Sequence, residues 1–318
     1  MTEPPMLNQS ISAEEISRLR AQSYNATVLR RIDISDELAR FQIRPDSGVV
    51  PFQPGQYVAL GLGYWEPRVA GSQLEEVEEK KLRKLVRRAY SIACPILDDT
   101  GQLAPCDTLD YLEFYIVLVR QADKPPALTP RLFTLRDGDR ISVEKKIVGH
   151  YVLSGIQPKD PVFFFATGTG EAPHNSMLTS LLAAGHQGPI VNATCVRKRC
   201  DLGYLQIHQA LMEKYPNYHY YSYTTREPEN MDGTHLNFVG KQYLQSEVTS
   251  GRLEEVCGAS LSSDHAHVFL CGNPEMIGYE PPGSTPLRTP GMIQILEKRG
   301  FRHDGDPGPG LIRFEKYW

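Results

Sequence analysis

Short apolar segments separated by turn residues run through the first half of the chain, from residue 24 to about residue 153. Pro54-Gly55 and Asp137-Gly138 are among the turn sequences between them. This rhythm is typical of short strands joined by tight turns, and it predicts an antiparallel β-barrel. The expected strands cover residues 25–34, 39–44, 56–62, 89–94, 111–120 and 140–148.

The pattern changes after Pro158, where apolar strands alternate with turns and helical segments. Strands are expected at 162–166, 190–196, 218–224 and 267–270, and helices at 175–184 and 205–214. Such alternation predicts a doubly wound α/β domain with a parallel sheet. We therefore expect an N-terminal extension (1–23), a β-barrel domain (24–157) and an α/β domain (158–318).

Two segments depart from these patterns. In residues 73–87, acidic residues precede basic ones by four positions, as in Glu76 and Lys80, and this spacing favours an inserted surface helix. Residues 279–309 are rich in proline and glycine, which predicts a long irregular excursion.

Composition narrows the possible classes of protein. A length of 318 residues suits two domains, and 41% hydrophobic with 23% charged residues is ordinary for a globular protein. A net charge of -4 gives no reason to expect nucleic-acid binding. The N-terminal stretch does not resemble a signal peptide and no long apolar run follows, so we expect a cytoplasmic protein that does not enter a membrane.

The six cysteines are spread thinly, which favours reduced thiols over a disulfide framework. Cys195 and Cys200 have the first spacing of a plant-type iron–sulfur motif, but Gly203 stands where its third cysteine would be. We therefore expect no metal site.

The tetrapeptide Arg88-Ala89-Tyr90-Ser91 opens a predicted strand. A flavin needs a cation for its pyrophosphate, a flat surface for its ring and a hydrogen-bond donor near N5, and Arg88, Tyr90 and Ser91 offer these three. The residues are equally consistent with ordinary surface and core positions of a strand.

Gly168-Thr169-Gly170-Glu171-Ala172-Pro173 follows an apolar strand and precedes a helix. Free N–H groups and the helix dipole favour a phosphate at such a place, and glycine lets the backbone come close to it. The third glycine of the dinucleotide fingerprint is replaced by Pro173, so a simple tight turn stays an alternative.

Cations gather at the ends of the next two strands. Arg197, Lys198 and Arg199 follow one strand, Arg226 follows the other, and Lys241 comes shortly after. Strand ends line the ligand crevice of a doubly wound sheet, so these charges suit a 2′-phosphate. Asp201 could instead bind a ribose diol and favour NADH, and each cation alone is consistent with solvated surface.

Cys271-Gly272-Asn273-Pro274 ends the late buried strand. Glycine and proline permit a sharp turn there, so the thiol is expected to face the mouth of the crevice. A buried structural cysteine is the alternative.

Together these motifs resemble a known family. Over residues 24–318 the chain resembles the bacterial ferredoxin–NADP reductases in the order and approximate spacing of its motifs. The motifs are Arg88-Ala89-Tyr90-Ser91, Gly168-Thr169-Gly170 with Ala172-Pro173, Thr225-Arg226-Glu227, Cys271-Gly272-Asn273-Pro274 and Tyr317-Trp318. Supporting stretches are Pro54-Gly55-Gln56-Tyr57, Leu112-Glu113-Phe114-Tyr115, Pro130-Arg131-Leu132 and Asp201-Leu202-Gly203-Tyr204.

The resemblance implies an FAD-binding barrel and an NADP(H)-binding α/β domain. It implies as FAD-binding residues Arg88, Tyr90, Ser91, Lys146, Gly149, His150, Tyr151, Val152 and Trp318. For NADP(H) it implies Gly168, Thr169, Gly170, Arg197, Arg226, Lys241 and Gly272. Ser91, as a donor to flavin N5, and Cys271, beside the nicotinamide, are the implied catalytic residues, and Trp318 would pack on the flavin, at its adenine.

The implied activity is exchange of a hydride with NADP(H) and of single electrons with ferredoxin or flavodoxin, by a protein expected to be a monomer. A basic docking face for the carrier would lie on the predicted helix at Lys80, Lys81, Arg83, Lys84 and Arg87. Interspersed glutamates make an ordinary solvated helix equally consistent.

Three other functions stay open: the reductase component of an oxygenase, a free-flavin reductase, and an NADP(H)-binding regulatory module without catalysis. Glu171 favours the last of these. It stands where the family usually has a small or hydroxyl residue, and it is expected to put negative charge beside the diphosphate.

Overall fold

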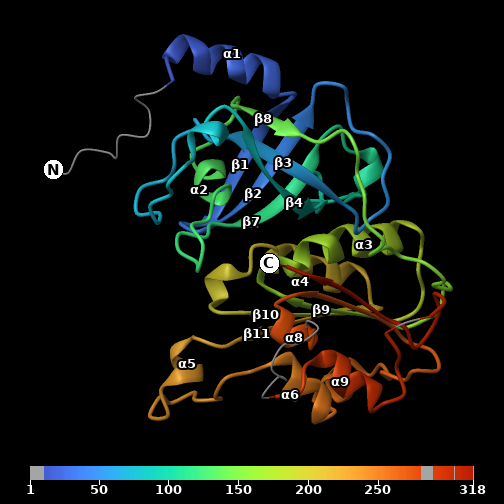
Figure 1. Ribbon diagram of the computed structural model, residues 1–318. Coiled ribbons are helices and arrows are strands. Elements are labelled where there is room, and N and C mark those ends of the chain that lie inside the picture. The colour runs from blue at the N-terminus through green and yellow to red at the C-terminus, as the bar shows by residue number, and fades with distance from the viewer. Residues whose placement is uncertain (1–10, 281–288, 304, 318) are drawn as a thin grey trace. The chain divides into compact units, whose positions relative to one another are not determined.

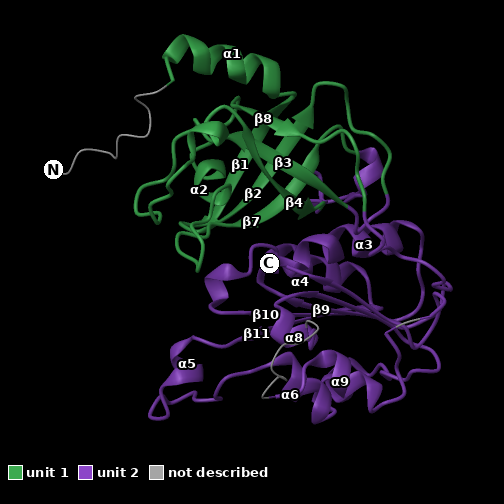
Figure 2. Ribbon diagram, in the orientation of Figure 1, with its two compact units in different colours: residues 1–52, 57–92, 109–148 green, residues 53–56, 93–108, 149–318 purple. Residues whose placement is uncertain are grey.

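The computed structural model describes residues 11–280, 289–303 and 305–317, and the chain divides into two compact units (Figure 1; Figure 2). Unit 1 comprises residues 1–52, 57–92 and 109–148, and unit 2 comprises 53–56, 93–108 and 149–318. The long final segment of unit 2 thus begins at Gly149, before the change of pattern at Pro158. The reason is that this segment bonds within unit 2: the Ser154 carbonyl accepts a hydrogen bond from Arg313 at 2.7 Å.

Unit 1 is built on a six-stranded antiparallel sheet with the strand order β4-β3-β8-β1-β2-β7. Inward-facing residues such as Val28, Phe41 and Phe114 are fully buried and form its core. The expected antiparallel β class of the first half is confirmed. The strands are β1 Ala26–Ser35, β2 Leu38–Pro45, β3 Tyr57–Gly63, β4 Leu85–Ser91, β7 Leu112–Val117 and β8 Arg140–Val143.

Short helices accompany this sheet. Helix α1, Ala13–Ser23, lies in the N-terminal extension and begins at Ser12, whose hydroxyl accepts a hydrogen bond from the N–H of Glu15. Helix α2 covers Thr129–Leu132, and a single 3₁₀ turn, η1, covers Glu79–Lys81.

The predicted surface helix over residues 73–87 is wrong. Residues 73–78 have no regular structure, η1 follows, and β4 already begins at Leu85 and pairs with β3. The charged residues bind distant partners instead: Arg83 pairs with Glu15 of α1 and Arg131 pairs with Glu75. Helical i,i+4 ion pairs are worth only a few tenths of a kcal/mol, so such tertiary contacts override them.

Unit 2 contains a parallel five-stranded sheet with the order β11-β10-β9-β12-β13. Its central strand β9 is an unbroken apolar run and is almost entirely buried, as expected of a parallel strand covered on both faces. The α/β class of the second half is confirmed. The strands are β9 Val162–Thr167, β10 Ile190–Val196, β11 Tyr218–Thr224, β12 His267–Gly272 and β13 Ile312–Lys316, with the small pair β5 Ile96–Leu97 and β6 Leu103–Ala104.

Helices cover both faces of this sheet (Figure 1). Helices α3 and α4 lie on one face, and α6, α8 and α9 lie on the other, where they enclose the apolar cluster around Phe163 and Val268. The helices are α3 Glu171–Ala183, α4 Leu205–Lys214, α5 Pro228–Met231, α6 Leu244–Thr249, α7 Arg252–Cys257, α8 Pro274–Ile277 and α9 Met292–Glu297. The 3₁₀ turns of unit 2 are η2 Cys106–Thr108, η3 Gly168–Gly170 and η4 Arg199–Asp201.

Candidate functional site

The turn after β9 is open on one side and closed on the other. Gly168 has a φ of +54°, and no atom lies within 4 Å of the position that a Cβ would occupy. A Cβ on Gly170 would lie 2.3 Å from the carbonyl oxygen of Cys271, so only glycine fits there. The helix α3 starts directly afterwards, with the free N–H groups of its first turn. The open space beside Gly168, just before a helix start, fits a diphosphate.

The end of β12 packs against this turn through glycine as well. Gly272 has a φ of +124°, and its Cβ would lie 2.3 Å from the hydroxyl oxygen of Thr167. That hydroxyl accepts a hydrogen bond from the N–H of Asn273 at 2.8 Å. The two strand ends that carry predicted nucleotide-binding residues therefore meet with backbone against backbone.

The predicted cations Arg197, Arg226 and Lys241 are brought together. The N–H of Arg226 donates to the carbonyl of Arg197 at 2.8 Å, and the N–H of Gln242, next to Lys241, donates to Thr224 at 3.3 Å. All three side chains are at least partly exposed, and none forms an ion pair with any residue that the structure describes. Three uncompensated cations at neighbouring strand ends suit a dianionic phosphate.

The neighbouring charges are already engaged. Arg199 pairs with Glu229 at 2.7 Å, and one carboxylate oxygen of Asp201 accepts a hydrogen bond from the N–H of Lys198 at 3.1 Å. Asp201 thus caps its own 3₁₀ turn, which leaves it less suited to the ribose diol of NADH.

Glu171 does not point at the turn. Its side chain is 1% exposed and extends into unit 2, where one carboxylate oxygen accepts from Tyr220 at 2.9 Å and Thr194 at 3.3 Å and lies 3.1 Å from His208 Nε2. The expected negative charge facing the diphosphate is therefore corrected: the carboxylate is enclosed by hydrogen-bond donors.

Arg88, Tyr90 and Ser91 lie on β4, an edge strand of unit 1 that pairs with β3. Arg88 is exposed, Tyr90 is half-buried and Ser91 is buried. Burial raises the pKa of Tyr90, so its hydroxyl stays protonated. Lys146 follows β8, is exposed, and has no ion pair among the described residues. A cation, an aromatic face and a hydroxyl on one strand are the groups that a flavin requires.

The remaining predicted FAD residues lie in unit 2. Gly149 has a φ of +127°, and its carbonyl accepts a hydrogen bond from Gln56 at 3.2 Å. His150 is exposed and Val152 is partly buried, whereas the Tyr151 ring packs on Phe269 in the core. A shallow hollow of about 360 Å³ is lined by His150 and Tyr151 together with residues 311–315.

Tyr151 also contacts the buried His174, and its hydroxyl lies 2.7 Å from His174 Nε2. Burial raises the pKa of Tyr151 well above its usual range and lowers the pKa of His174 to about 3. The ring of His174 is therefore neutral at physiological pH, and the Tyr151 side chain serves the core of the unit.

Cys271 is fully buried rather than exposed at the mouth of a crevice. Burial raises the pKa of its thiol well above the usual range, and the hydroxyl of Tyr317 hydrogen-bonds to the sulfur. The charge of Glu315 also raises the pKa of this thiol. A thiol in this setting stays protonated. Trp318 lies outside the described residues.

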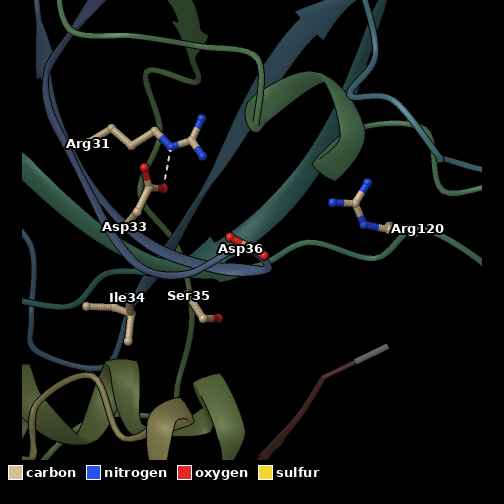
Figure 3. A pocket seen from close by; sticks show the side chains of 6 residues that line it. All are labelled: Arg31, Asp33, Ile34, Ser35, Asp36 and Arg120. Carbon is tan, nitrogen blue, oxygen red and sulfur yellow. Dashed lines mark hydrogen bonds and ion pairs between the residues drawn. The ribbon is translucent and has the colours of Figure 1, made fainter.

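A second hollow, of about 410 Å³, lies in unit 1 at the turn between β1 and β2 (Figure 3). It is lined by Arg31, Asp33, Ile34, Ser35, Asp36 and Arg120. Arg31 pairs with Asp33 at 2.7 Å and Arg120 pairs with Glu37 at 3.0 Å, so its charges compensate one another. None of the predicted site residues lines it.

Metal-binding clusters and membrane-spanning helices are both absent from the described part of the chain. No group of three or more His, Cys, Asp or Glu residues there could hold a metal ion. No helix there has the length and apolar character needed to span a bilayer.

Comparisons with known proteins agree with this geometry. Residues 164–280 match the oxidoreductase NAD-binding domain family. The flavodoxin/ferredoxin–NADP reductase of Buchnera aphidicola subsp. Baizongia pistaciae is 28% identical over 280 residues, which cover 87% of this chain and 92% of that protein. The corresponding Escherichia coli reductase is also 28% identical, over 75% of this chain and 81% of its own length. The chain is an oxidoreductase that is similar in sequence to the flavodoxin/ferredoxin–NADP reductases.

Solved structures support the fold of this oxidoreductase. A ferredoxin NADP+ reductase from Neisseria gonorrhoeae, solved with bound FAD and NADP, matches with a TM-score of 0.67 at 20% identity. The match covers 92% of this chain and 97% of that one. A cytochrome P450 reductase from Amycolatopsis matches with a TM-score of 0.60 at 22% identity, over 92% of this chain and 69% of its own. These likenesses confirm the fold class.

Two residues near the oxidoreductase site, Glu315 and Tyr243, were missed from the sequence, and Tyr317 was named only as part of a motif, without a role. Tyr317 and Glu315 act on Cys271, and Tyr243, two residues after Lys241, exposes 44% of its surface beside the cations. A half-exposed aromatic ring beside cations offers a surface for a purine. Tyr243 could have been selected from the sequence, because it follows Lys241 by two residues. Glu315 and Tyr317 could not, because their position beside Cys271 depends on the pairing of β13 with β12.

Proposed function

We propose that this protein exchanges a hydride with NADP(H) and single electrons with ferredoxin or flavodoxin, using bound FAD. The observation that carries the proposal is the joint presence, at the carboxyl ends of β9, β10 and β11, of an open glycine turn and three uncompensated cations. Support comes from the curated relatives, which are named flavodoxin/ferredoxin–NADP reductases.

The α/β unit would hold NADP(H) by its two phosphate-bearing parts. Gly168, Thr169 and Gly170, with Gly272 beside them, would receive the diphosphate against the start of α3, where no atom lies within 4 Å of the Cβ position of Gly168. Arg197, Arg226 and Lys241 would bind the 2′-phosphate. NADH lacks that phosphate, so these cations would favour NADPH.

The groups on β4 fit FAD. Arg88 would bind the pyrophosphate, Tyr90 would lie against the ring and Ser91 would donate a hydrogen bond to N5. Lys146 and the 149–152 segment would bind the adenosine side, and we keep Trp318 as a proposed contact of the adenine. Bound FAD would supply the chemistry that accepts a hydride and releases electrons singly.

Cys271 would act by packing rather than by proton transfer. Its thiol is buried and hydrogen-bonded by Tyr317, and its raised pKa keeps it neutral. A small neutral side chain beside the nicotinamide would leave space for the ring and exclude water from it.

The carrier would bind through cations that have no partner. Among the described residues, Lys84, Lys145 and Lys146 form no ion pair, whereas Lys80 and Lys81 both pair with Glu78. The originally expected docking face is therefore partly neutralised. We propose that Lys84 and Lys145, both in unit 1, attract an acidic carrier.

The experiment that tests the proposal is an anaerobic titration of the purified protein with NADPH and, separately, NADH, following the visible absorbance of bound flavin. We expect NADPH to bleach the flavin rapidly and NADH to do so poorly. A protein that holds no flavin, or whose flavin neither nucleotide reduces, would contradict the proposed function. Reduction of added free flavin in place of ferredoxin would move a free-flavin reductase to the front.

A further inference from the structure

The buried carboxylate of Glu171 occupies an unusual place, between the diphosphate turn and the two strands that carry the cations. It is the first residue of α3, directly after Gly170. Its hydrogen-bonding partners come from three other elements: Thr194 from β10, His208 from α4 and Tyr220 from β11. One side chain therefore links the start of α3 to two neighbouring strands.

The network around Glu171 is buried. Thr194 and His208 are fully buried and Tyr220 is 5% exposed. The His208 ring stacks on Tyr220 with 4.0 Å between centroids, and its Nδ1 lies 2.7 Å from the Tyr218 hydroxyl. A His208 proton on Nε2 satisfies both ring contacts, because Nε2 then donates to Glu171 and Nδ1 accepts from Tyr218. Hydrogen bonds to a buried charge fix its position strongly.

The linked strands are those that end at the 2′-phosphate cations. Thr194 precedes Arg197 along β10, and Tyr220 precedes Arg226 along β11. Gly170 is held on its other side by contact with Cys271. The carboxylate and its three partners thus add a side-chain link between the turn after β9 and the strands that end at the cations, beside the ladder that pairs β9 with β10 and β10 with β11.

We propose that Glu171 is a positioning residue for the dinucleotide: it holds the diphosphate turn at the spacing from Arg197 and Arg226 that intact NADP(H) requires. The inference rests on the proposed function. An intact dinucleotide must reach both phosphate sites at once, so it gains from their fixed spacing, whereas a fragment that reaches only one site gains nothing from it.

The test compares two ligands by calorimetry on the purified full-length protein. NADP+ reaches both phosphate sites, and adenosine 2′-monophosphate reaches only the cations. Substitution Glu171→Gln leaves the side-chain size but removes the charge that the three donors need, and we expect the Kd for NADP+ to rise about tenfold. The Kd for adenosine 2′-monophosphate should stay within about twofold of wild type.

A milder variant and a matched control make the test independent of folding defects. Tyr220→Phe removes the shortest of the three hydrogen bonds, and it should raise the Kd for NADP+ about threefold. Tyr223→Phe removes the hydroxyl of another buried tyrosine on the same strand, one with no hydrogen bond to Glu171, and it should change neither Kd. The ratio of the two dissociation constants is the readout, because general damage to the fold would not alter it.

Each outcome has one meaning. An unchanged Kd for NADP+ in both Glu171→Gln and Tyr220→Phe overturns the positioning role. An equal loss of affinity for both ligands also overturns it, because the whole nucleotide site would then have been damaged. Failure of the wild-type protein to bind either ligand would instead reject the proposed function.

Discussion

At the scale of single residues, the proposed binding of the 2′-phosphate by cations can be tested separately from the binding of the diphosphate by the glycine turn. Arg226 has no ion pair among the described residues, so its charge is available to a 2′-phosphate. We expect Arg226→Gln to raise the KM for NADPH about tenfold and to leave the KM for NADH unchanged, because only NADPH carries the phosphate. Steady-state kinetics with both nucleotides measures this.

Arg199→Gln is the matched control for Arg226→Gln. Arg199 stands on the neighbouring turn, but its guanidinium is engaged by Glu229. Its loss should therefore change the KM for NADPH much less. Equal increases for NADPH and NADH in Arg226→Gln would show that the residue supports the site generally and does not read the 2′-phosphate.

His174 predicts a pH dependence of stability. Burial lowers its pKa to about 3, whereas the unfolded chain has the ordinary value near 6.5. Below about pH 6.5 the unfolded state binds a proton that the folded state refuses, so stability falls as the pH falls toward 3, by up to about 1.4 kcal/mol per pH unit. Denaturant unfolding at pH 7.0 and 5.0 measures the difference.

The variant His174→Phe isolates this contribution. It should be less stable than wild type at pH 7, because the Tyr151 hydroxyl loses its partner, yet its stability should fall less between pH 7 and pH 5. His186, His219 and His267 also have pKa values lowered by burial, and they contribute to the dependence that remains. The same pH slope in both proteins would mean that His174 does not titrate as described.

Residue types were predictable from the sequence, but side-chain directions were not. Arg197, Arg226 and Lys241 could be selected because the carboxyl ends of parallel strands line the ligand crevice of a doubly wound sheet. The inward direction of Glu171 depends on Thr194 and Tyr220, which lie 23 and 49 residues further along the chain. A glutamate at the first position of a helix is expected to be exposed, and the sequence alone does not show whether its side chain points into the core.

At the scale of elements, strong local patterns were reliable. The ranges expected for β10, α4 and β11 coincide with those found, because apolar runs and helical periodicity there agree with the tertiary packing. Strand β13 was missed, because Ile312–Lys316 is short and three of its five residues are charged. It is recognisable only once β12 offers it an edge.

Residues 73–78, which were expected to be helical, belong to an irregular loop that covers residues 64–78. Arg131 forms hydrogen bonds to residues near both ends of this loop. Arg131 is 2% exposed, donates to Glu75 at 2.7 Å and to the Tyr64 carbonyl at 3.1 Å, and packs over the Tyr64 ring. We expect Arg131→Met to lower the free energy of unfolding by about 2 kcal/mol, since it removes the closer of the two arginines that pair with Glu75 and leaves only Arg68, at 3.5 Å. Chemical denaturation measures this, with the exposed Arg136→Met as the control.

A second substitution tests the cause of that loss. The triple variant Arg131→Met/Glu75→Leu/Arg68→Met removes the carboxylate and both arginines that pair with it, and it should recover part of the stability, because no partly buried charge of this cluster is then left unpaired. A triple variant as unstable as Arg131→Met alone would instead assign the loss to the packing on Tyr64 and to the carbonyl hydrogen bonds.

At the scale of the whole molecule, net charge conceals the distribution that matters. The chain carries a net charge of -4, yet each unit has cations without ion pairs among the described residues: Lys84 and Lys145 in unit 1, and Arg197, Arg226 and Lys241 in unit 2. A count of charges could not separate these from Lys80 and Lys81, which Glu78 compensates. The ion pairs of Glu78 with Lys80 and Lys81 could not be predicted from the sequence, because the 3₁₀ turn η1 stands where a helix was expected and brings different residues together.

This distribution predicts how the carrier responds to charge and salt. Neutralising Lys84 and Lys145 to Gln should raise the KM for ferredoxin about fivefold at low ionic strength, since steering depends on local uncompensated charge. Added salt should erase the difference from wild type. NADPH oxidation by a small dye should not change.

The double variant Lys80→Gln/Lys81→Gln removes the same net charge from a compensated cluster, so it should change the KM less. Equal effects of the two double variants would mean that ferredoxin senses only the overall charge. Unchanged KM values in both would place the docking surface elsewhere on the molecule.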